Sequence, residues 1–161
     1  MSWYYLDTSA LLKRYRTERG SDVVSALFSG RQPDEVFVTS HFTSVEVEAV
    51  AARALKGRVL NRRAYGVLLR LFAEDLESQL VILPVSTALV SEAAAAARRY
   101  ALRAADALHI ATAGRLQRGA APEVFLVTSD KELVRAGEAA GFAILDPEAA
   151  DAWKTLNRLR A

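Results

Sequence analysis

Short apolar segments alternate with longer segments of helical period along this chain. The short segments are rich in β-branched and aromatic residues, and they predict strands over residues 4–6, 36–39, 80–85, 124–128 and 142–145. The longer segments carry apolar residues three and four positions apart, and they predict helices over residues 10–15, 22–28, 45–56, 62–77, 87–100, 104–118 and 131–140. Glycines and prolines fall at the expected helix ends and in connections, at Gly20, Gly30, Gly57, Gly119, Pro122, Gly141 and Pro147.

Nearly all of the predicted strands are apolar throughout rather than alternating. This pattern is typical of a parallel sheet whose two faces are both covered by helices. We therefore expect a single domain over residues 1–161, of the α/β class with three α/β/α layers. A last helix from Pro147 carries Trp153, Leu156 and Leu159 on one side, so the segment 147–161 should dock on the body of the domain.

Composition narrows the classes of protein that fit this pattern. Apolar residues make up 52% of the 161 positions, which is enough to form a full core. The absence of cysteine excludes disulfides and zinc–thiolate sites. The N-terminal residues lack the regions of a signal peptide, and the uncharged stretch 78–91 is too short to cross a membrane. We therefore expect a cytoplasmic protein.

Four acidic residues fall at the ends of predicted strands or the starts of predicted helices. Asp7 directly follows the first strand, and Asp130 follows the fourth. Glu46 and Asp106 lie in the first turns of the helices predicted after the second strand and before the fourth. Because ligands bind beyond the carboxyl ends of the strands in an open parallel sheet, these four carboxylates could meet in one crevice.

Each of these acids also has an ordinary structural explanation. Asp7 and Asp130 could cap the helices that follow them. Glu46 has the spacing of a capping box with Thr43. Asp106 could be a first-turn acid that the helix dipole favours.

Asp106 fits its structural explanation least. Its helix face continues through Ile110 and Ala113, which should point inward, and a buried carboxylate is costly unless it is paired or bound to a cation. Two unit charges about 4 Å apart repel by about 4 kcal/mol at an effective dielectric of about 20. Four carboxylates in one crevice would therefore need protonation or cations. Oxygen ligands without thiolates favour Mg²⁺ or Mn²⁺.

Four segments around these acids resemble the motifs of a known family. Residues 5–13 (YLDTSALLK) are similar to the first motif of PIN domains, especially the VapC-type toxins of toxin–antitoxin pairs. The second, third and fourth motifs resemble residues 44–47 (SVEV), 106–113 (DALHIATA) and 127–133 (VTSDKEL). Glu48 lies two positions beyond Glu46 and is the alternative acid of the second motif. The resemblance covers nearly the whole chain.

This resemblance implies a fold, an activity and partners. It implies a five-stranded parallel sheet in the order 3-2-1-4-5, and Mg²⁺ or Mn²⁺ bound mainly by Asp7 and Asp106, with Glu46 and Asp130 completing the site. The implied activity is that of a metal-dependent endoribonuclease, the toxin of a VapBC-type pair. Such a protein would be a homodimer held by a small VapB-like antitoxin that blocks the site.

The reaction expected from such a site is hydrolysis of an RNA phosphodiester by a metal-activated water. In-line attack at phosphorus would leave a 5′-phosphate and a 3′-hydroxyl. We expect the hydroxyls of Ser9 and Thr128 to orient the carboxylates, although each could equally be a helix-cap or strand-end hydroxyl. His109 could face the site, but a core or helix-surface position explains it better.

Basic residues should supply the contacts to RNA. The net charge is +2, and setting four metal-bound acids aside leaves 21 minus 15, or +6. Lys13 is the last residue of the first motif and Arg14 follows it, and we expect one of them to contact RNA phosphates. Other basic residues lie nearby or around the second helical hairpin, where many arginines simply face solvent: Arg16, Arg53, Lys56, Arg58, Arg62 and Arg63.

Two other functions compete with this hypothesis. A PIN-like module could bind RNA or a partner protein without cutting. Receiver domains and haloacid-dehalogenase-type phosphatases have a similar sheet, but they need a second acid beside Asp7, where Thr8 and Ser9 stand. The apolar segments 68–72 and 93–97 could form a dimer or antitoxin surface, or they could belong to the core.

Overall fold

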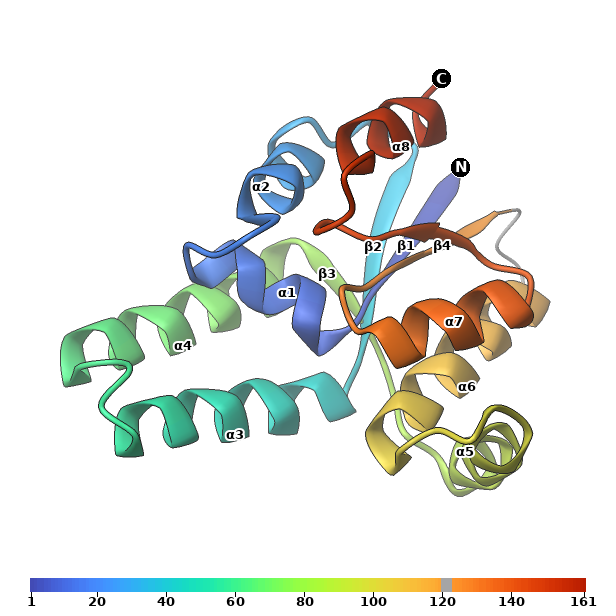
Figure 1. The fold of residues 1–161 in the computed structure, drawn as a ribbon, viewed down its shortest axis with the longest axis horizontal. Coiled ribbons are helices and arrows are strands. Elements are labelled where there is room, and N and C mark those ends of the chain that lie inside the picture. Colours follow the sequence, from blue (N-terminus) through green and yellow to red (C-terminus); the bar gives the residue numbers. More distant parts are fainter. Residues whose placement is uncertain (120–122) are drawn as a thin grey trace.

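A five-stranded sheet lies between two layers of helices in the computed structural model, which describes residues 1–119 and 123–161 (Figure 1). The predicted connection at Pro122 lies outside the described residues. The strands are β1 (Ser2–Leu6), β2 (Glu35–Ser40), β3 (Leu80–Leu83), β4 (Val124–Val127) and β5 (Ala143–Leu145). The helices are α1 (Thr8–Tyr15), α2 (Ser21–Ser29), α3 (Phe42–Lys56), α4 (Arg62–Ser78), α5 (Thr87–Tyr100), α6 (Ala104–Gly119), α7 (Lys131–Ala139) and α8 (Ala152–Leu159).

All four strand pairs are parallel, and the strand order is β3-β2-β1-β4-β5. This confirms the predicted three-layer α/β/α class and the order that the family resemblance implied. β1 and β4 are neighbours in the middle of the sheet, with Leu6 paired to Val127. The residues that follow these two strands therefore emerge side by side at the carboxyl edge of the sheet.

Alternate residues of the central strand face opposite helical layers. Tyr4 and Leu6 are buried in a core with residues of α1, α2, α3, α4 and α8. Tyr5 is buried on the other face with residues of α6 and α7, and α5 covers α6 from outside. Apolar strands thus contact helices on both faces, as their composition predicted.

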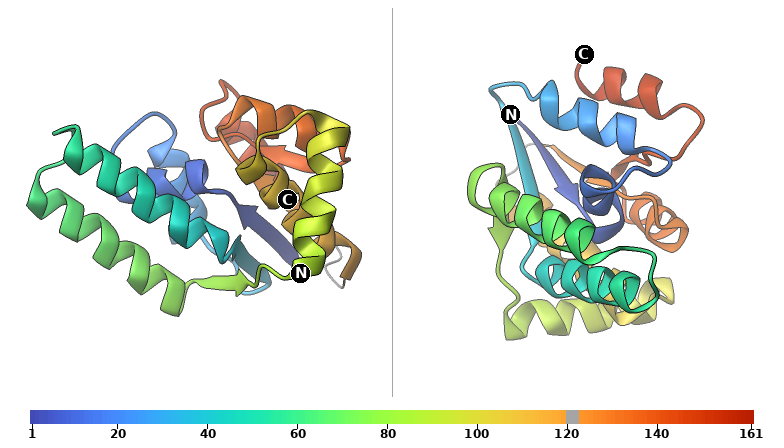
Figure 2. Two further views of the ribbon diagram at one scale, coloured as in Figure 1. Left: turned by 90° about the horizontal axis from the view of Figure 1, so that it is seen from below. Right: turned by 90° about the vertical axis from the view of Figure 1, so that its left-hand side faces the viewer.

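α3 and α4 form an antiparallel hairpin that projects beyond the sheet (Figures 1 and 2). Leu68 and Phe72 hold the base of α4 in the main core, and Ala93 of α5 is buried against α6. The core interpretation of the segments 68–72 and 93–97 therefore applies to these three residues. Within the described residues, no helix is long and apolar enough to span a bilayer.

The capping box predicted between Thr43 and Glu46 is absent. α3 begins at Phe42, three residues earlier than expected, so Thr43 lies inside the helix. Its hydroxyl lies 2.8 Å from that of Thr39 in β2, which in turn donates to the carbonyl oxygen of Leu6. Thr43 therefore ties α3 to the sheet, and the side chain of Glu46 is left for other contacts.

The start of the last helix was also predicted wrongly. α8 begins at Ala152 rather than at Pro147, because the chain first forms turns. Asp146 fixes these turns: its carboxylate accepts from the backbone N–H of Glu148 at 2.8 Å, and its carbonyl accepts from that of Ala149 at 3.1 Å. Ala152 and Leu156 of α8 are buried in the main core, so the helix docks as expected.

Candidate active site

Asp7 lies at the carboxyl end of β1 and is only 3% exposed. Its Oδ1 accepts hydrogen bonds from the backbone N–H of Ala10 and the hydroxyl of Ser9, both at 2.9 Å. Its Oδ2 accepts a hydrogen bond from the hydroxyl of Thr128, also at 2.9 Å. Asp7 therefore caps α1, as its structural explanation required, and two hydroxyls that the sequence singled out hold its carboxylate in one orientation.

Ser9 and Thr128 also join the ends of β1 and β4. The hydroxyl of Ser9 accepts from the backbone N–H of Ser129 at 2.9 Å, and that of Thr128 accepts from the backbone N–H of Asp130 at 3.1 Å. These bonds fix the start of α1 against the turn that precedes α7. Residues more than a hundred positions apart thereby form one hydrogen-bonded network.

Glu46 lies in the second turn of α3 and contacts residues beside this network. Its Oε2 accepts a hydrogen bond from the hydroxyl of Thr8 and lies 2.6 Å from Nε2 of His109. Glu48, the alternative acid of the second motif, is exposed to solvent. Among the two glutamates, Glu46 is the one that contacts residues of the first and third motifs.

His109 is buried, 2% exposed, between two polar partners. Its Nδ1 lies 2.8 Å from the hydroxyl of Tyr5, and its Nε2 lies against Glu46. Burial alone would lower the pKa of His109, but the hydrogen bond to Glu46 and the charges of Asp7, Glu46 and Asp106 raise it. The expected core position is confirmed, and the same side chain also contacts the acid cluster.

Asp106 lies in the first turn of α6, and its pKa is influenced by the other three acids. Burial raises its pKa to about 6, together with the negative charges of Asp130, Asp7 and Glu46, while His109 acts in the opposite direction. Burial likewise raises the pKa of Asp7, against the influence of His109 and of its three hydrogen bonds. Asp106 therefore lies near enough to the other three carboxylates for their negative charges to act on it.

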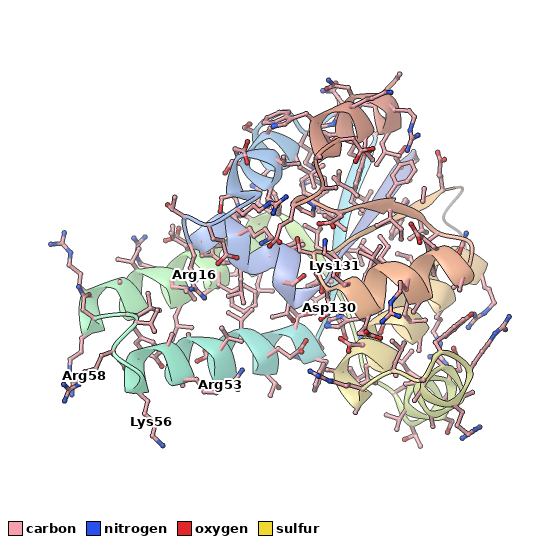
Figure 3. The ribbon with its side chains drawn as sticks, viewed as in Figure 1. Arg16, Arg53, Lys56, Arg58, Asp130 and Lys131 are labelled. Carbon is pink, nitrogen blue, oxygen red and sulfur yellow. The ribbon has the colours of Figure 1, made fainter. Side chains whose placement is uncertain are left out.

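Asp130 lies at the start of α7 (Figure 3). Its Oδ1 accepts from the backbone N–H groups of Glu132 at 2.8 Å and Leu133 at 3.1 Å, so it caps the helix. The predicted cap is present, and its two hydrogen bonds both use Oδ1. As with Asp7, the capping role and a place in the acid cluster coexist.

The donor set of this cluster fits a hydrated divalent cation. Among the described residues, the carboxylate oxygens of this cluster that accept at most one hydrogen bond are Oδ2 of Asp7, Oε1 of Glu46, Oδ2 of Asp130 and both oxygens of Asp106. Within residues 1–119 and 123–161, no three acids or histidines form a ready-made metal site. Mg²⁺ keeps several of its waters and takes only one or two carboxylates directly, so it suits acids that converge without closing around one point.

Lys13 and Arg14, the basic residues expected to contact RNA, are held elsewhere. Lys13 is 4% exposed, and its Nζ lies 2.5 Å from Glu148 and 3.2 Å from Glu18. Arg14 forms a two-pronged ion pair with Asp75 of α4. Both side chains brace α1 against its neighbours, and neither is free for a polyanion in this structure.

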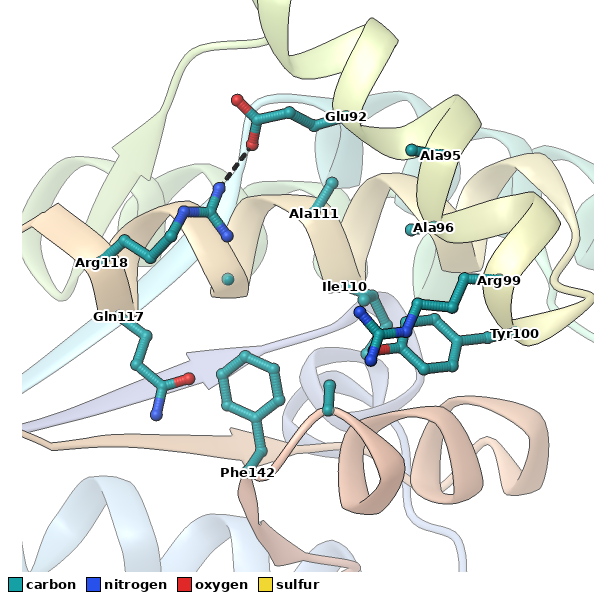
Figure 4. A pocket seen from close by; sticks show the side chains of 12 residues that line it. Glu92, Ala95, Ala96, Arg99, Tyr100, Ile110, Ala111, Gln117, Arg118 and Phe142 are labelled. Atoms are coloured by element: carbon teal, nitrogen blue, oxygen red, sulfur yellow. Dashed lines mark hydrogen bonds and ion pairs between the residues drawn. The ribbon is translucent and has the colours of Figure 1, made fainter.

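A separate cavity of about 460 Å³ lies between α5, α6 and the residues before β5 (Figure 4). Ile110 and Phe142 are among its apolar lining residues, and Arg118 pairs with Glu92 in the same lining. None of the four acids is among the residues that line it. The four acids at the sheet edge, called the acid crevice below, are therefore separate from this cavity.

Comparison with known proteins identifies the family of this chain. The PIN domain family model matches residues 4–139. Ribonuclease VapC35 of Mycobacterium tuberculosis is 35% identical over 143 residues, which cover 89% of this chain and 96% of the relative. Ribonuclease VapC45 of the same species is 31% identical over 151 residues, 91% of this chain and 100% of the relative.

Solved structures agree on the fold. The crystal structure of Mycobacterium tuberculosis VapC20, a toxin that cleaves the sarcin–ricin loop, superposes with a TM-score of 0.64 at 17% identity and covers 91% of this chain and 98% of its own. DNA-bound VapBC from Salmonella typhimurium gives a TM-score of 0.60 at 20% identity, with 91% and 99% covered. With the family model matched over most of its length and curated relatives above 30% identity, the chain belongs to the PIN domain family.

Proposed function

We propose that this protein is a metal-dependent endoribonuclease, the toxin of a VapBC-type toxin–antitoxin pair. The observation that carries the proposal is the placement of four acids at the carboxyl edge of β1 and β4. Thr128 bonds to both Asp7 and the backbone of Asp130, and Thr8 beside Asp7 bonds to Glu46. Burial and the charges of these three acids raise the pKa of Asp106 to about 6. The relatives named ribonucleases support the same reaction.

Asp7 and Asp106 would hold a Mg²⁺ or Mn²⁺ ion, with Glu46 and Asp130 bound to it or to its waters. Bound there, the ion would lower the pKa of a water and offset charge on the phosphate. Ser9 and Thr128 keep Asp7 oriented through their hydrogen bonds. The attacking water would form a bond to phosphorus as the bond to the 3′-oxygen breaks, and that oxygen would take up a proton.

Thr8 and His109 position Glu46 from two sides. The hydroxyl of Thr8 donates to Oε2, and Nε2 of His109 lies against the same oxygen. One oxygen of Glu46 is thereby fixed, which leaves the other to face the crevice. His109 itself is buried behind Glu46, so it acts as a positioning residue rather than as a group that touches RNA.

The partners that we propose follow from the relatives. Several solved neighbours are complexes of a toxin with its antitoxin, including VapBC from Salmonella typhimurium and from Rickettsia felis. We infer a small VapB-like antitoxin that covers the acid crevice, a homodimeric toxin and a cytoplasmic location. The RNA target is to be found by experiment.

Cleavage assays with matched variants test this function. The purified protein should cut RNA with Mg²⁺ or Mn²⁺, and a chelator should stop the reaction. Asp7→Asn and Asp106→Asn should lower the rate by at least about 100-fold, because each removes a charge on which ion binding depends. Glu46→Gln should also lose activity, whereas Glu48→Gln, two positions away on an exposed face of the same helix, should not.

The competing function is a PIN-like module that binds without cutting. The lack of a ready-made metal site in the described part of the chain is the observation in its favour. Tight RNA binding with no metal-dependent cleavage would support this alternative and contradict the nuclease. End-group analysis of the products should find 5′-phosphates if the proposed reaction is correct.

A further inference from the structure

The part of the α3–α4 hairpin that spans residues 49–73 carries positive charges and no negative ones. Residues 49–73 contain no acidic residue and six basic ones, Arg53, Lys56, Arg58, Arg62, Arg63 and Arg70. This segment therefore carries +6, and because the chain as a whole carries +2, all other residues together carry −4. Such a separation of charge creates a local field that attracts anions.

Five of these residues surround the turn between the two helices and form what we call the hairpin tip: Arg53, Lys56, Arg58, Arg62 and Arg63. All five are exposed. In the part of the chain that the structure describes, none of them lies within ion-pairing distance of an acid. Elsewhere many basic residues are paired, such as Arg14 with Asp75 and Arg160 with Glu35. Like charges gathered without partners repel one another, and a polyanion would relieve that repulsion.

The backbone at Arg58 gives a second, independent observation. Arg58 has a φ of 59°, in the left-handed region that favours glycine, whereas Gly57 beside it has a φ of −78°. The turn is closed by backbone hydrogen bonds from Val59 and Leu60 to the carbonyl of Ala54. The tip thus holds a long cationic side chain at a position where glycine would be less strained, as functional residues often are.

α3 connects the hairpin tip to the acid crevice. Glu46 and Arg53 are seven residues apart, so they lie on the same face of the helix about 10 Å apart along its axis. Lys56 follows one turn later. In Figure 3, α3 runs from the region of Asp130 toward the labelled side chains of Arg53 and Lys56, with Arg58 at the far end. A strand of a few nucleotides can cover this distance.

We propose that the hairpin tip binds backbone phosphates of single-stranded RNA a few nucleotides away from the bond that is cut. This inference rests on the proposed ribonuclease function. The crevice carries four carboxylates and attracts phosphate only through its cation, so the tip supplies the part of the RNA affinity that needs no metal. Contacts to phosphate do not depend on base sequence, and they weaken as salt rises.

RNA binding by charge-matched variants tests the proposal. The tip variant combines Arg53→Gln, Lys56→Gln and Arg58→Gln, and the control combines three exposed basic residues on α5 and α8, Arg98→Gln, Lys154→Gln and Arg158→Gln. Both variants lose three positive charges. Binding of a fluorescent single-stranded RNA of about 16 nucleotides is followed by anisotropy with a chelator present, at several salt concentrations.

The tip variant should bind this RNA about 10- to 100-fold more weakly at about 0.1 M salt, and the slope of log affinity against log salt should shrink by about 2. The control should match the wild type in both quantities. Equal affinities and equal slopes for the tip variant and the control would overturn the proposal.

The variant Arg58→Gly separates the loss of an RNA contact from a loss of binding caused by unfolding. Glycine relieves the left-handed backbone at this position, so the variant should melt at about 2–4 °C above the wild type. It should still bind RNA more weakly, because one phosphate contact is gone. Weaker binding in a more stable protein cannot come from damage to the fold, whereas unchanged binding would contradict a role for Arg58.

Failure of this inference differs from failure of the proposed function. A wild-type protein that cuts RNA with Mn²⁺, combined with a tip variant that binds like the control, would refute only the hairpin tip. A wild-type protein that never cuts RNA would refute the nuclease, and the metal-free binding data would still decide the role of the tip.

Discussion

At the scale of one residue, the ionised carboxyl of Asp106 lowers the stability of the fold. Its pKa is raised from the ordinary 3.8 to about 6 by burial and by the neighbouring acids. The folded state therefore takes up this proton more readily than the unfolded state between these two values. Stability from this group is highest below about pH 4 and falls as the pH rises through about 6.

Asp106→Asn should consequently stabilise the metal-free protein at about pH 7.5. Because Asp106 is partly open to solvent, we expect a gain of about 1 kcal/mol in the free energy of unfolding rather than the full value of the shift. Near pH 4 the two proteins should melt alike, since the wild-type carboxyl is then neutral too. Thermal melts with a chelator across this pH range measure the difference, with Glu48→Gln as the control for loss of a solvated carboxylate. A variant that melts below the wild type at about pH 7.5 would contradict the strain that we infer.

Residue roles differ in how far the sequence can predict them. Asp7 and Asp130 are fixed by their own strands, so their place at the sheet edge follows from local pattern. The contact between His109 and Tyr5 joins positions 104 apart, and nothing in the local pattern of either residue indicates it. Lys13 was expected to contact RNA because it is close to Asp7 in sequence, but its direction is set by Glu148 near the other end of the chain.

At the scale of elements, Gly20 joins the start of α2 to the connection after β5. It has a φ of 82°, and a Cβ atom there would lie 2.6 Å from the carbonyl oxygen of Pro147. Gly20→Ala should lower the free energy of unfolding by about 2–4 kcal/mol, through left-handed strain and a clash with backbone. Gly66→Ala is the matched control: nothing lies near its Cβ position inside α4, so the variant should gain about 0.5–1 kcal/mol. Denaturant titrations of both variants check the opposite signs, and a Gly20→Ala protein as stable as wild type would show that this close approach is not rigid.

Element boundaries were predictable where local chemistry decides them. The strands are continuous apolar runs, and all five were found close to their predicted positions. α3 begins earlier than its apolar period suggested because Thr43 bonds to Thr39 in the sheet, a contact between elements. α8 begins later than Pro147 because Asp146 stabilises turns after β5, so an expected helix start became a connection.

At the scale of the whole molecule, the C-terminal segment ties together parts that are distant in sequence. Arg160 donates to both carboxylate oxygens of Glu35, at 2.8 and 2.9 Å, and to the carbonyl of Leu27 at 2.7 Å. The end of the chain thereby contacts α2 and the first residue of β2. The helical pattern of α8 predicted that it docks, but the strand order came from the family resemblance. Periodicity identifies which segments are strands and does not state which of them are neighbours.

The carboxylate of Glu35 needs the ion pair with Arg160, because Glu35 is only 4% exposed. Burial alone would raise the pKa of Glu35, but the hydrogen bonds and charge of Arg160, together with the backbone N–H of Gln32, hold it below its ordinary value. A carboxyl with a lowered pKa contributes stability above its unfolded-state pKa and loses it as the pH falls through the folded-state value. The ion pair therefore stabilises the fold at neutral pH and not in acid.

Arg160→Ala should lower the free energy of unfolding by about 3–5 kcal/mol at about pH 7, since it leaves a buried charge without its partner. Arg158→Ala, an exposed position on the same helix, should change it by at most about 0.5 kcal/mol. The deficit of Arg160→Ala should narrow below about pH 4, where Glu35 becomes protonated and needs no partner. Denaturant titrations at the two pH values measure both effects. A deficit that stays constant into acid would show that Arg160 acts through packing alone, and the C-terminal segment would then be held by apolar contacts rather than by the pair with Glu35.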